Sequence, residues 1–293
     1  MEHAQGRQQS AASPIPWAFF RLTPFPQIAI RVMQMVNRED VPLHRVSTLI
    51  ASDPAFASEL LTIANSPLYS PRVPATSVLQ AVSRIGTRHI QGLCLTVAVR
   101  AYLGKSLHHP AMQAIWHHNL ATALVAEELA IIFSMDKDLA YTAGIMHDIG
   151  RLAMAVLKPE EYASLLEQFQ GSASSVLEAE CSLFGFDHCQ AGQQLIATWN
   201  LPLDFEAVVA YHHTSTEGES IWTIARLVNL SCRIADTAGF PAFLHCEAQP
   251  YGDLLAELPN QVRNRLYPDL ADLSADIHDK INAIETPEAT PSR

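Results

Sequence analysis

Apolar residues recur at three- and four-residue spacing along most of this chain, which is the pattern of helices that bury one face. One clear example begins at Asp53, an N-cap type of residue, followed by Pro54 at the first helical position, and it places Phe56 and Leu60 on one face. The alternation of apolar and polar residues that is typical of strands is nearly absent. The pattern therefore predicts an all-α fold.

Helices are predicted over residues 53–65, 77–85, 87–103, 111–133, 138–157, 160–169, 175–184, 188–199, 203–213 and 219–237. Residues 252–284 contain Pro259 and Pro268, so two or three short helices are expected there. Three pairs have the spacing of capping boxes, Ser77 with Gln80, Ser175 with Glu178 and Asp187 with Gln190.

The expected organisation is two helical lobes joined at a hinge near Ser106 to Pro110. The predicted boundaries are 17–105 for the N-terminal lobe, 106–240 for the second lobe and 241–285 for the C-terminal helices. Residues 1–16 and 286–293 lack apolar periodicity and are expected to be flexible tails.

Composition limits the cellular compartment and the classes of binding partner that we expect. The 30 acidic residues exceed the 19 basic ones, for a net charge of -11, which disfavours nucleic acid as a partner. No signal-peptide pattern and no apolar run of about 20 residues is present, so no membrane association is expected. Five cysteines with no Cys-x-x-Cys pair are typical of a reducing compartment. We therefore expect a cytoplasmic protein.

Histidines carry the candidate chemistry. Several of the 13 histidines fall inside helical patterns of the second lobe, namely His117, His118, His147, His188, His212 and His213. Imidazole and carboxylate are ligands for divalent metals, so the adjacent Asp148 makes His147 a candidate ligand. A His-Asp pair alone is weak evidence, because His278–Asp279 is a second one. The first pair differs in lying among small and apolar residues, where buried polar groups need partners.

The segment Gly144-Ile-Met-His-Asp-Ile-Gly-Arg151 resembles the signature helix of the HD superfamily, whose active members are metal-dependent phosphohydrolases. His118 matches the histidine of the preceding helix, while His188 and His212–His213 resemble the later histidine segments of the HD-GYP branch. In the N-terminal lobe, an ordered series of segments resembles the HDOD domain, the HD-related output domain of bacterial signalling: Leu22-Thr-Pro-Phe-Pro-Gln27, Ile50-Ala-Ser-Asp-Pro54, Asn65–Ser66, Tyr69 and Ala81-Val-Ser-Arg-Ile-Gly86. Together these matches cover about residues 18–240.

This resemblance implies an N-terminal helical lobe packed on an HD-like helical core, and a regulatory role without an established general activity. It makes candidate metal ligands of His118, His147, Asp148, His188, His212 and His213. Cys232 stands where catalytic members carry their last aspartate ligand, Arg151 replaces the usual lysine, and no Gly-Tyr-Pro follows His213. A thiolate suits zinc better than magnesium or manganese. Asp236, one turn later, is a possible substitute ligand.

Each candidate also has a simpler interpretation. His118, His147, Asp148 and His188 form either a buried hydrogen-bond network, a metal site without turnover or a working phosphohydrolase site. His212–His213 is alternatively a pair at a helix end, where the macrodipole favours imidazolium. Arg151 binds either phosphate or a surface carboxylate, and Cys232 is alternatively a small buried residue. The segment 65–69 is either an interaction surface or a helix end with a packed tyrosine.

We therefore predict a bacterial signal-transduction protein that acts through contacts with a signalling or regulatory protein, without catalysis and with no required cofactor. The alternative is a metal-dependent HD-type phosphohydrolase or phosphodiesterase that uses a divalent metal on a nucleotide or cyclic dinucleotide, with Arg151 as a phosphate contact. A DNA-binding regulator is disfavoured by the net charge and by the lack of a dense basic helix.

Overall fold

The computed structural model describes residues 25–36, 41–69, 72–202, 205–214 and 221–285, and these are overwhelmingly helical. The N-terminal helices are α1 (Gln27–Val36), α2 (Leu43–Ala51), α3 (Pro54–Ala64), α4 (Val78–Ile85) and α5 (Thr87–Leu103). The all-α class predicted from the apolar pattern is confirmed. The segments predicted to be flexible tails lie outside the described residues.

After a 3-10 turn, η2 (Gly104–His108), the second group is α6 (Pro110–Phe133), α7 (Lys137–Met146), α8 (Ile149–Leu157), α9 (Pro159–Gln168), α10 (Val176–Phe184), α11 (His188–Thr198), α12 (Glu206–Tyr211) and α13 (Ile224–Thr237). The last group is α14 (Tyr251–Ala256), α15 (Asn260–Arg263) and α16 (Leu270–Glu285). A two-residue parallel bridge joins β1 (Gln170–Gly171) to β2 (His245–Cys246). Residues 106–110, where a hinge was predicted, span the end of η2 and the first residue of α6.

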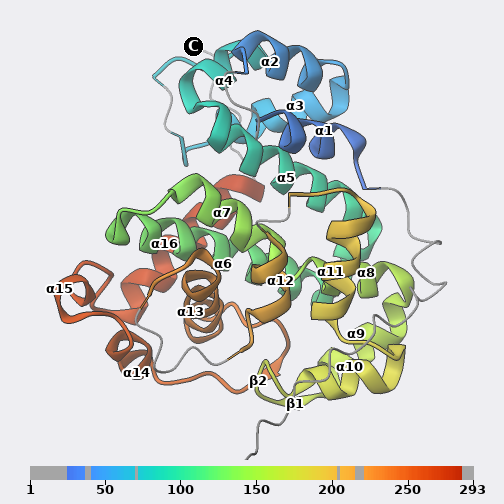
Figure 1. The fold of residues 1–293 in the computed structure, drawn as a ribbon, viewed down its shortest axis with the longest axis vertical. Coiled ribbons are helices and arrows are strands. Elements are labelled where there is room, and N and C mark those ends of the chain that lie inside the picture. The colour runs from blue at the N-terminus through green and yellow to red at the C-terminus, as the bar shows by residue number, and fades with distance from the viewer. Residues whose placement is uncertain (1–24, 37–40, 70–71, 203–204, 215–220, 286–293) are drawn as a thin grey trace, which may run out of the picture.

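Helices α1–α4 gather at one end of the molecule, and α5 separates them from the second group (Figure 1). Helix α5 packs on α1, α3 and α4 on one side and on α7 and α8 on the other, so it is buried on nearly every face. The C-terminal helix α16 returns to pack on both α3 and α6. One continuous hydrophobic core therefore runs through both groups of helices.

Two of the helix N-termini are capped as the sequence predicts, and one is not. The Asp53 carboxylate accepts the first free backbone N–H groups of α3, and Asp187 with Gln190 forms a complete capping box on α11. The capping box predicted at Ser175 is wrong. Its hydroxyl donates to the carbonyl of Ser172 instead, so it is turned away from the helix that follows.

The helix predicted over 138–157 is also corrected, because the chain breaks at His147–Asp148 into α7 and α8. The break lets α7 pack on α6 while α8 packs on α11. Both contacts need glycine: a Cβ on Gly144 would lie 2.5 Å from the Cα of Ala123, and one on Gly150 would lie 1.9 Å from the carbonyl oxygen of His188. The two close approaches bring the His-Asp pair against two different helices.

Other helix ends shift by a few residues. The helices predicted from 203 and 219 begin at Glu206 and Ile224 within the described residues. Among the helices of the described ranges, none combines the length and hydropathy needed to cross a bilayer.

Candidate metal centre

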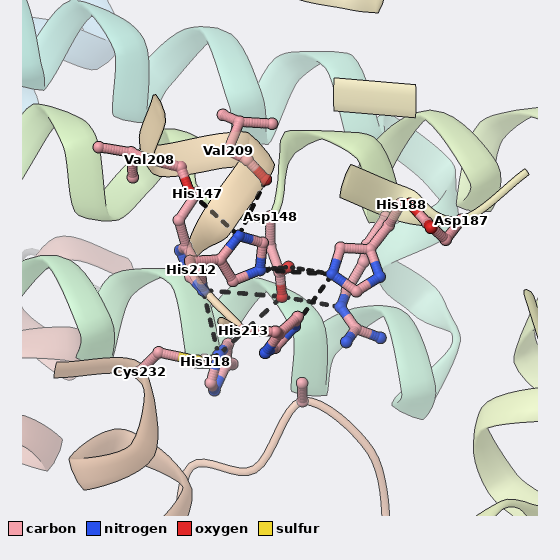
Figure 2. Close-up of polar contacts among 12 residues, drawn as sticks. His118, His147, Asp148, Asp187, His188, Val208, Val209, His212, His213 and Cys232 are labelled. Carbon is pink, nitrogen blue, oxygen red and sulfur yellow. Dashed lines mark hydrogen bonds and ion pairs between the residues drawn. The ribbon is translucent and has the colours of Figure 1, made fainter. Parts of the chain in front are cut away.

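The candidate ligands come from five helical segments that meet in the interior. His118 lies in α6, the His147–Asp148 pair lies between α7 and α8, His188 begins α11, the His212–His213 pair follows α12, and Cys232 lies in α13. Figure 2 shows these side chains gathered around Asp148. All are buried except His213, which is part-exposed. The fold therefore brings together residues up to 114 positions apart in the chain.

Asp148 is the centre of this arrangement. Its Oδ1 lies 3.1 Å from Nε2 of His212 and 3.3 Å from Nε2 of His188. Its Oδ2 faces the other side, 3.7 Å from Nε2 of His147 and 4.0 Å from Nε2 of His118. The two carboxylate oxygens thus face two different sets of imidazoles.

The two sets each have enough ligand atoms for a metal ion. The first consists of Asp148, His188, His212 and His213, in which Nε2 of His188 lies 3.3 Å from that of His212 and 3.0 Å from that of His213. The second consists of His118, His147 and Cys232, in which Nε2 of His118 lies 3.3 Å from Nε2 of His147 and 3.4 Å from Sγ of Cys232. Within each set the ligand atoms lie within 4.8 Å of one another.

The outer nitrogens of four histidines are already bonded, which fixes the direction of the inner ones. Each Nδ1 lies within hydrogen-bond distance of an acceptor: His118 of the Phe240 carbonyl at 2.8 Å, His147 of the Gly144 carbonyl at 2.6 Å, His188 of the Glu180 carboxylate at 2.6 Å, and His212 of the Val208 and Val209 carbonyls at 3.2 and 3.1 Å. A neutral imidazole that donates from Nδ1 presents a lone pair at Nε2. The four Nε2 atoms therefore point into the centre, as in metal sites whose ligands are oriented from behind.

Unprotonated Nε2 atoms that face one another repel unless a proton or a metal ion lies between them. The pKa of each histidine depends on the charged groups around its ring. Burial disfavours imidazolium, yet Cys232 and Asp236 raise the pKa of His118 well above its ordinary value. Burial and Arg151 oppose the charge on His188, but Glu180 raises its pKa to about 10. Burial holds the pKa of His147 well below its ordinary value. The pKa is therefore raised for the two rings that have a carboxylate beside Nδ1, and it is lowered for His147, His212 and His213.

A family model for the HDOD domain matches residues 22–215. The chain belongs to the HDOD domain family. The recognition made from sequence segments is therefore confirmed.

Solved structures of similar fold agree with this assignment. An HDOD domain protein with unknown function from Geobacter sulfurreducens is 23% identical, with a TM-score of 0.67 over 90% of this chain and 93% of that one. A "Putative signal transduction protein" from Marinobacter aquaeolei VT8 is 22% identical, with a TM-score of 0.68 over 90% of this chain and 60% of that one. A "Putative metal-dependent phosphohydrolase" from Shewanella amazonensis SB2B is 22% identical, with a TM-score of 0.64 over 90% and 92%. At these identities the likeness concerns the fold.

A curated protein of Treponema pallidum (strain Nichols), named "Uncharacterized protein", is 24% identical over 227 residues. The match covers 74% of this chain and 44% of that protein, so the HDOD chain spans less than half of its relative's length.

Behind the ligands of this HDOD domain lies a buried ionic network. Arg151 Nε forms an ion pair with Asp148 Oδ2 at 2.8 Å, and its Nη1 donates to Glu180 Oε1 at 3.2 Å. Tyr162 donates to the same Glu180 oxygen at 2.7 Å. Burial alone would raise the pKa of Glu180, but His188 and Arg151 hold it at about 2. Arg151 is fully buried, so it forms an internal ion pair rather than a surface one.

The remaining candidate residues differ in where they lie relative to this centre. Asp236 lies behind His118, with Oδ1 3.3 Å from Nδ1, so it orients that ring from outside the centre. Cys232 is buried with its sulfur on the inner side, beside Nε2 of His118. His117 points away from the centre and pairs with Glu285 of α16 at 3.1 Å.

Glu180 and Tyr162 were not predicted from the sequence. Glu180 lies one turn after Val176 on the buried face of α10, and both are fully buried. An acid in phase with an apolar stripe is a signal that a buried partner exists. Tyr162 carries no comparable local signal.

A cavity of about 370 Å³ reaches one edge of the centre. Its wall includes His212, His213, Asn229 and Arg233, but not His118, His147 or Cys232. Arg233 is bound to both carboxylate oxygens of Glu257, which neutralises its charge. Solvent therefore approaches the first set of ligands, while the second set lies deeper.

Proposed function

We propose that this HDOD protein is a regulator in signal transduction that acts through contacts with another protein, and that its centre has a structural rather than a hydrolytic role. The observation that carries the proposal is the buried ion pair between Arg151 and Asp148. The Arg151 guanidinium, which is fully buried, already neutralises the charge of the Asp148 carboxylate. A hydrolytic centre also needs an open position and a group that moves a proton to or from the substrate.

The chemistry of the donor set fits a transition metal. Within the first set, Oδ1 of Asp148 lies 3.1 Å from Nε2 of His212 and 3.3 Å from Nε2 of His188, and the latter lies 3.0 Å from Nε2 of His213. Asp148, His188, His212 and His213 would hold the ion, and a nitrogen-rich set of this kind suits zinc. A bound metal would supply a positive charge between facing Nε2 atoms, and so would tie α8, α11 and α12 together. Metal held in this way contributes to the stability of the fold.

Metal analysis tests the structural role. We expect protein purified without chelator to retain zinc or a similar ion, Asp148→Asn to lose it, and Asp279→Asn, in the exposed His-Asp pair of α16, to keep it. Removing the metal should lower Tm by about 5 °C, since about 2 kcal/mol of binding energy shifts Tm by roughly 2 to 4 °C per kcal/mol in a chain of this size. A metal-free protein with unchanged Tm in zinc would instead favour the buried proton network.

A hydrolysis assay tests the absence of turnover. Wild type would be incubated with p-nitrophenyl phosphate, bis-p-nitrophenyl phosphate and a cyclic dinucleotide in zinc, manganese and magnesium. We expect rates equal to those of Asp148→Asn. Robust turnover that disappears in Asp148→Asn, with circular dichroism unchanged, would overturn the proposal.

The second candidate is a metal-dependent phosphohydrolase, and the cavity beside His213 is the observation that favours it. A site open at one edge gives a substrate access to the first set of ligands. The name of the Shewanella protein points the same way, and that of the Marinobacter protein supports regulation. The same assay decides between the two.

The partner is tested separately, by crosslinking in the native host followed by mass spectrometry. The proposal expects a signalling or regulatory protein, captured equally by wild type and Asp279→Asn. If deletion of the gene causes no regulatory phenotype and no partner is crosslinked, the proposal is contradicted.

A further inference from the structure

A second cavity, of about 380 Å³, lies where α3 and α4 meet α5, α6 and α7. We call it the seam cavity, because it lies between the two groups of helices that α5 separates (Figure 1). Its wall includes Tyr69, Arg84, His89, Glu127, Lys137 and Tyr141 on the polar side. None of these residues belongs to the metal centre.

Residues 68–69, which follow α3, and Ala75 form one rim of the seam cavity. The side chain of Asn65 accepts from the backbone N–H of Ala75 at 2.7 Å and donates to its carbonyl at 3.0 Å, which holds these two parts of the rim together. Leu68 and Tyr69 line the cavity. The segment 65–69 is thus a helix end with a packed tyrosine, and its packing shapes a cavity.

The apolar side of the cavity is formed by Leu68, Ile85 and Leu124, with small alanines between them. A cavity of a few hundred Å³ with an apolar wall and a few placed polar groups has the usual make-up of a small-molecule site. The mixed wall therefore fits a ligand with an apolar body and a polar end.

A hydrogen-bonded chain orders the polar side. Nδ1 of His89 lies 2.8 Å from Asp138 Oδ1, and Nε2 lies 2.9 Å from the Tyr69 hydroxyl. Burial raises the pKa of Tyr69 well above its ordinary value, so its hydroxyl stays protonated and donates to the ring. Both ring nitrogens are then in use, so this histidine has no lone pair for a ligand.

The acidic groups here already have a cationic partner. Lys137 Nζ lies 2.8 Å from Glu127 Oε1 and 3.7 Å from Asp138 Oδ1, so its ammonium pairs with both carboxylates and offsets one of their two charges. Arg84 is the contrasting charge. It donates to the Val73 carbonyl, and no ion pair within the described ranges includes it. The cavity therefore combines an unneutralised guanidinium with an apolar wall.

We propose that the seam cavity binds a small organic anion with an apolar ring, held at its anionic end by Arg84 and along its ring by Leu68, Ile85 and Leu124. A carboxylate pairs with guanidinium through two parallel hydrogen bonds. Helix α7 contributes Lys137 and Tyr141 to this wall and ends next to His147, so the ligand contacts the helix that leads to the metal centre. This inference is independent of the proposed function.

The test compares 1-naphthylacetate with the neutral 1-naphthylacetamide, which have the same ring and nearly the same shape. Their Kd values for the full chain would be measured by ligand-observed NMR titration. We expect the acid to bind about tenfold more tightly than the amide in wild type. Arg84→Gln should remove this preference. Arg88→Gln, at an exposed arginine that lies in the first turn of α5 and pairs with Asp136, should keep it.

Three results would overturn the proposal: no binding of the acid, equal binding of acid and amide by wild type, or a preference that survives in Arg84→Gln. Loss of the preference in Arg88→Gln as well would also overturn it, since the effect would then be one of overall charge. Arg84 lies on the surface of α4, so its replacement leaves the core intact.

Discussion

Two clusters of histidine and carboxylate in this molecule have similar composition and different chemistry. In the candidate metal centre, His118, His147, His188 and His212 have their Nδ1 atoms at acceptors behind them and their Nε2 atoms facing one another. In the seam cavity, His89 uses one nitrogen on Asp138 and the other on Tyr69. The first arrangement leaves lone pairs that require a cation, and the second leaves none.

The two clusters also differ in how their charges are compensated. Asp148 and Glu180 are fully buried and share Arg151, so the loss of one partner strands a charge in the interior. Glu127 and Asp138 are part-exposed and share Lys137, where solvent screens the loss. Residue type alone is therefore a poor guide to the energy or the chemistry of a His/Asp cluster.

The largest expected effect is on the buried ionic network. Glu180→Ala removes the partner of both Arg151 and His188, and should lower the free energy of unfolding by about 4 kcal/mol because a buried charge is left unpaired. Urea unfolding at neutral pH measures it. Glu178→Ala, on the exposed face of the same helix, should change stability by less than about 0.5 kcal/mol. Equal effects of the two variants would break the contrast between centre and surface.

A backbone contact comes next. Gly150→Ala forces a Cβ against the carbonyl of His188, and should destabilise the protein by about 3 kcal/mol while displacing His188 from Asp148. Gly252 lies in α14 with open space around it, so Gly252→Ala should be neutral or stabilising by about 0.5 kcal/mol. Thermal unfolding of the pair measures the difference. A tolerated Gly150→Ala would show that α8 and α11 can separate without cost.

The metal preference of the centre is a smaller effect. Cys232 belongs to the second set of ligand atoms, with His118 and His147, so Cys232→Asp should raise manganese affinity of that set about tenfold and leave zinc binding by the first set unchanged. Calorimetric titration of both ions measures the change. Cys181→Asp, at an exposed cysteine, should leave both affinities unaltered. Unchanged manganese affinity in Cys232→Asp would show that the second set does not take up this ion.

The smallest effect belongs to the seam cavity. The hydrogen bond from His89 and the charge of Lys137 lower the pKa of Asp138 below its ordinary value, so its ionised form stabilises the fold. That contribution is complete above the unfolded pKa of about 3.9 and is lost as pH falls through the lower folded value. Asp138→Asn should therefore cost about 1 kcal/mol or less at pH 6, and the difference should shrink below about pH 4. If the cost of Asp138→Asn grew as the pH fell, folding would raise the pKa of Asp138 rather than lower it. Asp279→Asn, at an exposed aspartate, is the control.

Much of the helical architecture could be predicted from the order of residues. Periodicity, the Asp53 cap and the Asp187–Gln190 capping box act within a few positions, so they can be recognised without knowing which helices meet. The candidate ligands His118, His147, Asp148 and His188 were likewise found by residue type and resemblance. Their orientations could not be predicted, because adjacent His117 and His118 differ only in which neighbouring helix each one faces.

What the sequence by itself determined is thus the helical class, most helix positions and the residues that carry the chemistry, because these follow from local backbone preference and side-chain type. Tertiary structure alone decided the break at His147–Asp148, since that break depends on α7 and α8 packing on different helices. It also decided that Arg151 is buried against Asp148 and Glu180, and that Arg84 meets an apolar wall in the seam cavity. These contacts join residues far apart in the chain, and their energies depend on burial, which no local pattern specifies.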